Sequence, residues 1–468
     1  MNISKNFLSV FSINSKFNIY LIFLIGVFAR LIFLYCNTLL DITNVWPSIS
    51  RESLEGANKG ILGKILDGSA YKSGNYNEKF IAGHERGLFY LHSAFAYIFD
   101  QSKHLYVQIT NLLIDSSMIF VIFYIAKKLQ NINFGLICSF IYALFLPQIY
   151  VATQPTYDCY LTFSLLLMIF LTLKLFNEKK NYLSIFFIFF TLFIFNEFRS
   201  VTAFYGIFST LFLFFILKTP TEKRKLFFFF SVSVLAFVLS SSINYKLRGE
   251  FQPIRSSAGH QFFSGLSQFD ISGIGPGGDS ASSRYYEEKA GKKPDHVMSD
   301  AYNDFLEKEA VKYVTDNPVI YLRICLHRIV KIIFPNIMAS FIADDTAYWY
   351  QIMKDHTNER EIYYSENGRF TFKGLKFLMT QEPFHYSFTF FLRVGLMILF
   401  PFCILSVYKD RKKINTLISS IPLFYFLVFL TPLSVKPILL NSLYASQIPL
   451  ILSGLILTIS HIRKKNEK

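Results

Sequence analysis

The polar stretch at residues 41–90 carries the residue types that acid–base and phosphate chemistry require. It follows a first apolar segment, and its first residue is a carboxylate, Asp41. A carboxylate at a membrane surface is partly desolvated, which raises its pKa and suits it to general-base catalysis. Asp41 is therefore the first candidate catalytic residue, and a solvated loop acid or helix cap is the alternative interpretation.

A second acid of this stretch, Glu52, lies in SRESLEGANKGI, a segment that predicts a helix. Ser50 is its expected N-cap, and Ser53, Ala57 and Ile61 share one face. Glu52 is a candidate substrate-binding residue, although a charge on the helix surface is the favoured interpretation.

The tripeptide His84-Glu85-Arg86 closes the stretch where apolar sequence resumes. An arginine at the membrane interface can fork onto a lipid phosphate, so these three residues are candidate substrate ligands. A cation that simply extends to the interface is an equal alternative.

Two later polar turns carry further candidates. Asp158 follows Pro155 and opens an apolar run, where an acid is electrostatically favoured at a helix N-terminus. Asp158 is the second candidate catalytic residue, with capping as the alternative. Glu197 and Arg199 share the next such turn, and they are expected to pair with each other unless Arg199 binds substrate.

Arg323, His327 and Lys331 are spaced to form one cationic stripe along a helix. Such a stripe on an interfacial helix suits lipid phosphates, so Arg323 and Lys331 are candidate ligands; a solvated polar face is the alternative. Histidine pairs at metal spacing and a phosphate-binding loop are missing from the sequence. No cofactor or metal is expected, although a divalent ion is not excluded.

The elements that must position these residues are membrane spans. The chain has 468 residues, of which 52% are hydrophobic and 17% charged. A soluble protein carries about 25% charged residues, so the deficit indicates an integral membrane protein. Apolar runs of about 20 residues can each cross a bilayer as a helix. The predicted spans are 17–37, 105–126, 134–152, 157–176, 182–196, 200–217, 226–245, 384–408, 414–433 and 438–460.

The short cationic loops between these runs set the orientation. With a cytoplasmic N-terminus, all of them fall on the same side, as the positive-inside rule requires. The loops contain Lys127 and Lys128; Lys174, Lys179 and Lys180; Lys218, Lys223, Arg224 and Lys225; Lys409, Arg411, Lys412 and Lys413. The net charge of +15 is thus explained largely without nucleic acid. We expect a multi-pass plasma-membrane (bacterial inner-membrane) protein with both termini cytoplasmic and an extracytoplasmic active site.

Three regions follow from this layout. Residues 1–245 form an N-terminal transmembrane module with a catalytic outer loop at 38–104, and residues 384–468 form C-terminal transmembrane helices. Residues 246–383 form an extracytoplasmic domain, with an interfacial helix at 318–338. That helix carries Arg323, Arg328 and Lys331, and each cation costs about 3 kcal/mol at the centre of a span. The expected fold is an all-α polytopic bundle of about ten spans with a mixed outer domain.

The layout resembles the GT-C glycosyltransferases, and more narrowly the glycosyltransferase 39 group of protein O-mannosyltransferases and lipid A aminoarabinose transferase. The similar features are Asp41 with Trp46 and ISRESL after the first span, and ERGLFY at the entry to the next membrane segment. Asp158 in QPTYDCYLTF matches the second acid, which opens a later span. The helix start at Asn317-Pro318 and the tail segment YASQIP are also similar to family features.

The resemblance implies transfer of a sugar from a polyprenyl-phosphate donor to an acceptor glycan, lipid or protein in the cell envelope. Asp41 would be the base, Asp158 would orient the acceptor, and Arg86 would stabilise the leaving phosphate. A lipid-carried donor also fits an active site on the extracytoplasmic face, because nucleotide sugars are scarce outside the cell. Two alternatives stay open. An O-antigen ligase or polymerase relies on arginines in outer loops, and a flippase or transporter needs charges inside the spans, where charge is sparse.

Overall fold

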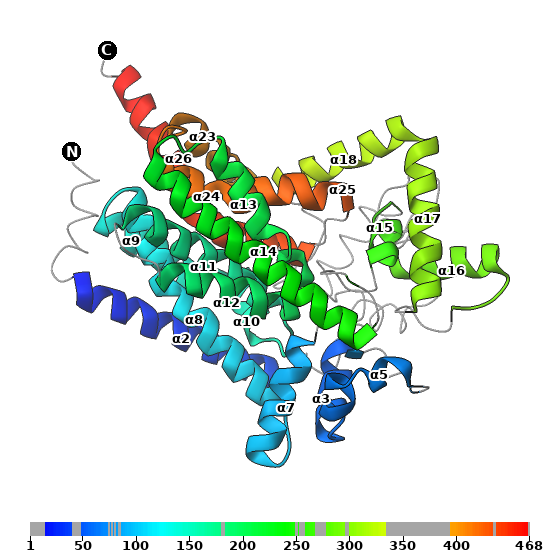
Figure 1. Ribbon diagram of the computed structural model, residues 1–468. Coiled ribbons are helices and arrows are strands. Elements are labelled where there is room, and N and C mark those ends of the chain that lie inside the picture. The colour runs from blue at the N-terminus through cyan, green and yellow to red at the C-terminus, as the bar shows by residue number, and fades with distance from the viewer. Residues whose placement is uncertain are drawn as a thin grey trace, which may run out of the picture.

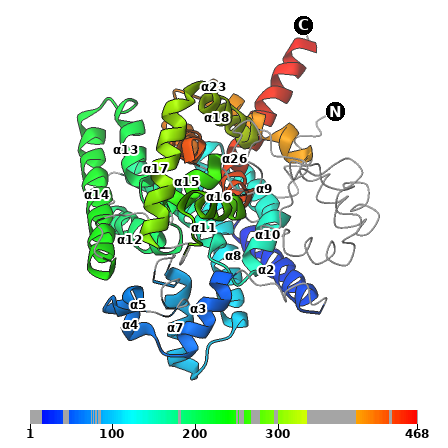
Figure 2. The same ribbon diagram turned by 90° about the vertical axis from the view of Figure 1, so that its right-hand side faces the viewer.

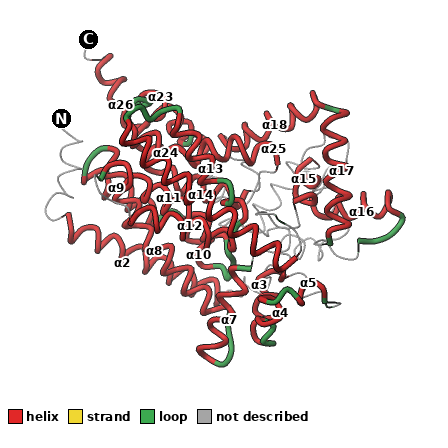
Figure 3. The backbone as a smooth tube through the Cα atoms, in the orientation of Figure 1, coloured by secondary structure: helices red, strands yellow, loops and turns green. Residues whose placement is uncertain are grey.

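The computed structural model describes residues 15–39, 48–73, 86–178, 183–248, 258–266, 278–294, 299–333, 394–433 and 437–466, with residues 75, 78, 81–82 and 251 between them. Within these residues every regular element is a helix (Figure 3). Backbone groups in lipid must be satisfied within the segment, and helices do this. The described residues thus confirm the prediction of an all-α membrane protein with several apolar helices.

Among the described residues, five helices are long and apolar enough to cross a bilayer. They are α2 (Ser15–Leu39), α8 (His104–Leu129), α11 (Asp158–Asn177), α14 (Pro220–Arg248) and α26 (Pro437–Asn466). A sixth candidate is the pair α9 (Ile132–Ala143) and α10 (Leu146–Thr153), which is bent by 54° at the break between them.

The remaining predicted spans correspond to shorter helices. These are α12 (Leu183–Phe198), α13 (Tyr205–Phe214), α23 (Pro401–Lys409) and α24 (Ile414–Tyr425), which η5 (Phe426–Leu430) and α25 (Thr431–Leu433) continue. With 16 residues, α12 is about 24 Å long, less than the roughly 30 Å of a hydrocarbon core. The count of ten spans therefore stays a prediction.

Helix α11 lies at the centre of the bundle, in contact with α8, α12 and α26. In α11, 72% of the apolar window is buried, against 28% in α2 at the periphery. The outer surfaces of α12 and α14 expose Phe186, Phe190, Phe227 and Phe230, as a lipid-facing surface should. Helices α23 and α26 approach so closely that a Cβ on Gly454 would collide with the carbonyl oxygen of Phe402.

The polar regions gather at one end of the bundle, opposite the ends marked N and C (Figures 1 and 2). There α3 (Ser48–Asn58), α4 (Leu62–Leu66) and α5 (Ser69–Lys72) lie beside α7 (Gly87–Phe99). The predicted helix over Glu52 is confirmed, with Ser53, Ala57 and Ile61 buried. It begins at Ser48, however, so Ser50 is its third residue and not its cap.

The described part of the region 246–383 is also helical. It comprises α15 (Ala258–Leu266), α16 (Gly278–Ala290), α17 (Asp300–Asp316) and α18 (Pro318–Ile333). Helix α18 begins at Pro318, as predicted, and buries Ile324, Arg328 and Ile332. Arg328 Nη1 donates to the carbonyl oxygens of Thr431 and Pro432 at 2.7 and 2.9 Å, which joins α18 to α25.

Candidate functional site

The chain segment 196–199 at the end of α12 contributes one residue to each of two ion pairs. In the first, Arg86 directs Nε and Nη2 at the two carboxylate oxygens of Glu197, at 3.0 and 3.2 Å. Arg86 Nη2 also donates to Asn244 Oδ1 of α14 at 2.9 Å. Arg86 is fully buried, so this forked pair fastens the start of α7 to α12 and α14.

The second ion pair joins Arg199 to Asp158, the first residue of α11. The guanidinium of Arg199 also lies over the ring of Tyr157, 4.3 Å from its centroid. The side chains of Arg199 and Asp158 are 17% and 11% exposed, whereas Arg86 is 0% exposed. The Asp158–Arg199 pair is therefore the more accessible of the two to a ligand.

Phe198 lies between the two pairs in the sequence and packs between α7 and α11. Its ring stacks on Tyr160, with centroids 4.0 Å apart and planes at 21°. Helix α12 ends at Phe198, and Arg199 is extended at φ −147° and ψ 105°. The expected pairing of Glu197 with Arg199 is wrong, because the helix end sends these two side chains to different partners.

Gly87 also packs against the Phe198 ring. A Cβ at Gly87 would lie 2.5–2.7 Å from ring atoms of Phe198, closer than real contacts allow. We expect Gly87→Ala to lower the unfolding free energy by about 1–3 kcal/mol, as overpacking does. Thermal unfolding of the purified protein checks this, and Gly63→Ala is the control, since a Cβ there meets nothing within 4 Å. Equal thermal unfolding midpoints for Gly87→Ala and Gly63→Ala would contradict the close packing of Gly87 against Phe198.

The electrostatics of the region differ between its groups. Burial disfavours a charge on Arg86, but the Glu197 carboxylate and Tyr90 together outweigh this and hold the pKa of Arg86 above its ordinary value. Burial raises the pKa of the Glu52 carboxyl, and the carboxylate of Glu55 adds to the rise. Arg86 is thus a permanent cation, while Glu52 holds a proton more readily than a solvated acid.

The structure brings together Arg86, Asp158 and Arg199 of the predicted site residues. Arg323 is exposed on α18, and within the described residues no contact joins it or Glu52 to the two ion pairs. The candidate residues Asp41, His84 and Glu85 lie outside the described residues. Of Lys331, a fourth candidate, only the backbone is described. In the parts of the chain that are described, no three His, Cys, Asp or Glu side chains cluster to hold a metal ion.

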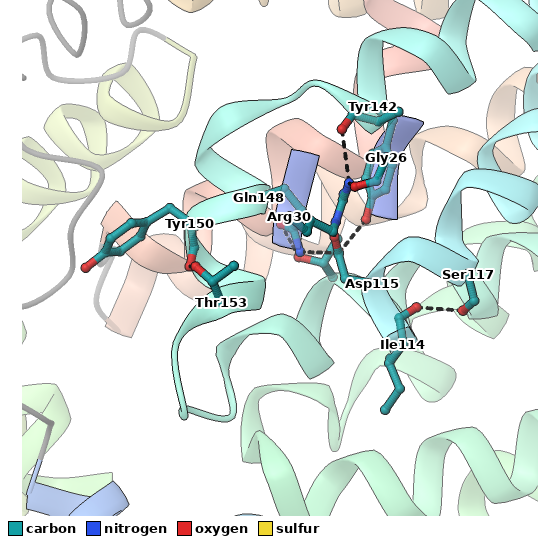
Figure 4. Close-up of polar contacts among 11 residues, drawn as sticks. Gly26, Arg30, Ile114, Asp115, Ser117, Tyr142, Gln148, Tyr150 and Thr153 are labelled. Atoms are coloured by element: carbon teal, nitrogen blue, oxygen red, sulfur yellow. Dashed lines mark hydrogen bonds and ion pairs between the residues drawn. The ribbon is translucent and has the colours of Figure 1, made fainter. Parts of the chain in front are cut away.

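A third ion pair, which the sequence analysis missed, lies inside the spans. Arg30 of α2 places Nε and Nη2 at 2.7 and 2.6 Å from Asp115 Oδ2 of α8 (Figure 4). Asp115 Oδ1 accepts from Tyr142 and Gln148, each at 2.7 Å. Charge within the predicted spans is sparse, but it includes this buried pair. The available signal was an arginine and an aspartate, each isolated in an apolar run.

This intramembrane pair holds the break between α9 and α10. Tyr142 and Ala143 end α9, and Gln148 lies in α10. Arg30 Nη1 donates to the carbonyl of Ala143 at 3.0 Å, a group that the end of α9 leaves without a helical partner. The charged pair thus satisfies the polar groups that a bent span exposes.

No protein-family model matches the chain, and no curated protein matches it significantly.

Proposed function

We propose that the chain is a membrane glycosyltransferase that moves a sugar from a polyprenyl-phosphate donor to an acceptor hydroxyl at the extracytoplasmic face. The observation that carries the proposal is the Asp158–Arg199 pair beside the Arg86–Glu197 pair at the end of α12. A partly exposed guanidinium beside a carboxylate suits a reaction in which a hydroxyl acceptor attacks the sugar and a phosphate leaves the donor.

In this mechanism Asp41 removes the proton from the acceptor hydroxyl, whose oxygen forms a bond with the anomeric carbon. The bond between that carbon and the phosphate oxygen breaks, and polyprenyl phosphate leaves with the electron pair. Arg199 stabilises the charge on the departing phosphate, and Asp158 holds Arg199 and orients the acceptor. Arg86, with Glu197 and Asn244 on two of its nitrogens, positions the segment that carries Arg199.

The proposal places the chain with the GT-C glycosyltransferases, in or near the glycosyltransferase 39 group. The support is the order of elements: a first span, an outer segment with α3, and an acid at the first residue of α11. Purified protein in liposomes should consume a polyprenyl-phosphate sugar and release polyprenyl phosphate. If no donor of a broad panel is consumed, the proposal fails.

The intramembrane Arg30–Asp115 pair is the observation that would favour a transporter of lipid-linked sugars. Yet Asp115 directs both oxygens at protein groups, and Arg30 donates to Gly26 and Ala143 in addition. We therefore assign the pair a structural role and keep the transferase as the proposed function.

A further inference from the structure

Four successive backbone carbonyl groups, 153–156, accept hydrogen bonds from side chains that lie outside their own turn. The donors are Gln108 for Thr153 at 2.9 Å, Asn111 for Gln154 and Thr156 at 2.8 Å each, and Ser50 for Pro155 at 2.6 Å. The turn joins α10 to α11 and ends just before Asp158.

The donors come from two separate elements and are all buried. Gln108 and Asn111 lie one turn apart on α8, and Ser50 lies on α3. Their exposed fractions are 5%, 0% and 0%. A buried amide is costly unless it is hydrogen-bonded, and carbonyl groups between two helices lack helical partners. Donors and acceptors therefore satisfy each other, and the turn is held along its whole length.

We propose that Gln108, Asn111 and Ser50 form a carbonyl clamp that positions Asp158 for the reaction. The clamp holds the turn from α8 and from α3, and the turn leads directly into Asp158, which pairs with Arg199. Ser50 adds a link from the turn to α3. The catalytic consequence rests on the proposed function, whereas the clamp itself does not.

Hydrogen–deuterium exchange of the full chain in nanodiscs tests the clamp without any substrate. Asn111→Asp removes the two amide N–H donors, keeps the size of the side chain and puts a carboxylate against two carbonyl oxygens. We expect amides 156–160 to exchange about tenfold faster or more. Unchanged exchange in this peptide would overturn the clamp.

Two further variants complete the test. Thr110→Val is the matched control on α8, because its hydroxyl donates only to Tyr106 of the same helix, and it should leave amides 156–160 unchanged. Ser50→Ala removes one of the four bonds and should give a smaller increase, which keeps the test decisive if Asn111→Asp does not fold. Equal exchange in Ser50→Ala and wild type would remove Ser50 from the clamp.

Kinetics then separate positioning from general stability. Asn111→Asp should lower kcat about 10–100-fold with KM within a factor of about two, since misplacement of a catalytic group affects the transition state. In an Asp158→Asn background the same change should have little further effect, because Asn111 acts through Asp158. An equal loss in both backgrounds would overturn the positioning role. If the wild type transfers no sugar, the proposed function fails, and the exchange result alone decides the clamp.

Discussion

Replacement of Asp115 by Ala is expected to lower the unfolding free energy by about 3–5 kcal/mol, because it leaves Arg30 buried without its counter-charge. Tyr142 and Gln148 lose their acceptor in the same variant, which loosens the break between α9 and α10. Unfolding of the purified protein in a detergent titration measures the loss. A wild-type midpoint for Asp115→Ala would contradict the structural role of the pair.

Ser117→Ala is the matched control on the same helix. The Ser117 hydroxyl donates to the carbonyl of Ile114 in its own helix and takes no part in the pair (Figure 4). It should change the unfolding free energy by no more than about 0.5 kcal/mol. A second test adds Arg30→Met to Asp115→Ala. Removal of both charges should recover most of the lost stability, because an unpaired buried charge costs more than an apolar pair.

Arg199→Gln is expected to have the largest effect on transfer among the described residues, with a loss of about 10²–10³-fold in kcat. The variant removes the cation that we assign to the leaving phosphate and leaves Asp158 without its partner. Steady-state release of polyprenyl phosphate measures the effect. Wild-type turnover in Arg199→Gln would contradict the assignment.

A second variant at position 199, with a control elsewhere, shows whether charge or geometry matters there. Arg199→Lys keeps the charge but loses the planar guanidinium that lies over the Tyr157 ring. We therefore expect a transfer rate between those of the wild type and Arg199→Gln. Lys59→Gln is the control, because Lys59 is an exposed cation paired with Glu55 on α3 and its loss should leave the rate within about twofold.

Much of the helical layout follows from local signals in the sequence. The long apolar runs predict α2, α8, α11, α14 and α26, because their length and composition alone suffice to cross lipid. The start of α18 at Pro318 follows from the preference of proline for the first turn of a helix. The break between α9 and α10 was missed, although Pro147 interrupts the predicted span 134–152 and lies in the first turn of α10, which begins at Leu146.

The pairing of charged residues could not be predicted in the same way. Arg30 and Asp115 are 85 positions apart, and only the packing of α2 against α8 brings them together. Glu197 and Arg199 are only two positions apart, yet the end of α12 directs them to Arg86 and Asp158. The partner of each charged residue therefore depends on tertiary contacts.

The most direct test of the proposed function is the release of polyprenyl phosphate by purified protein in liposomes, with a panel of polyprenyl-phosphate sugars as donors. Asp41→Asn is assayed alongside, after its membrane insertion is shown to equal that of the wild type. We predict release by the wild type with at least one donor and a loss of about 10²–10⁴-fold in the variant, the range of general-base catalysis. Full activity of Asp41→Asn would remove Asp41 as the base, and no release from any donor would contradict the glycosyltransferase itself.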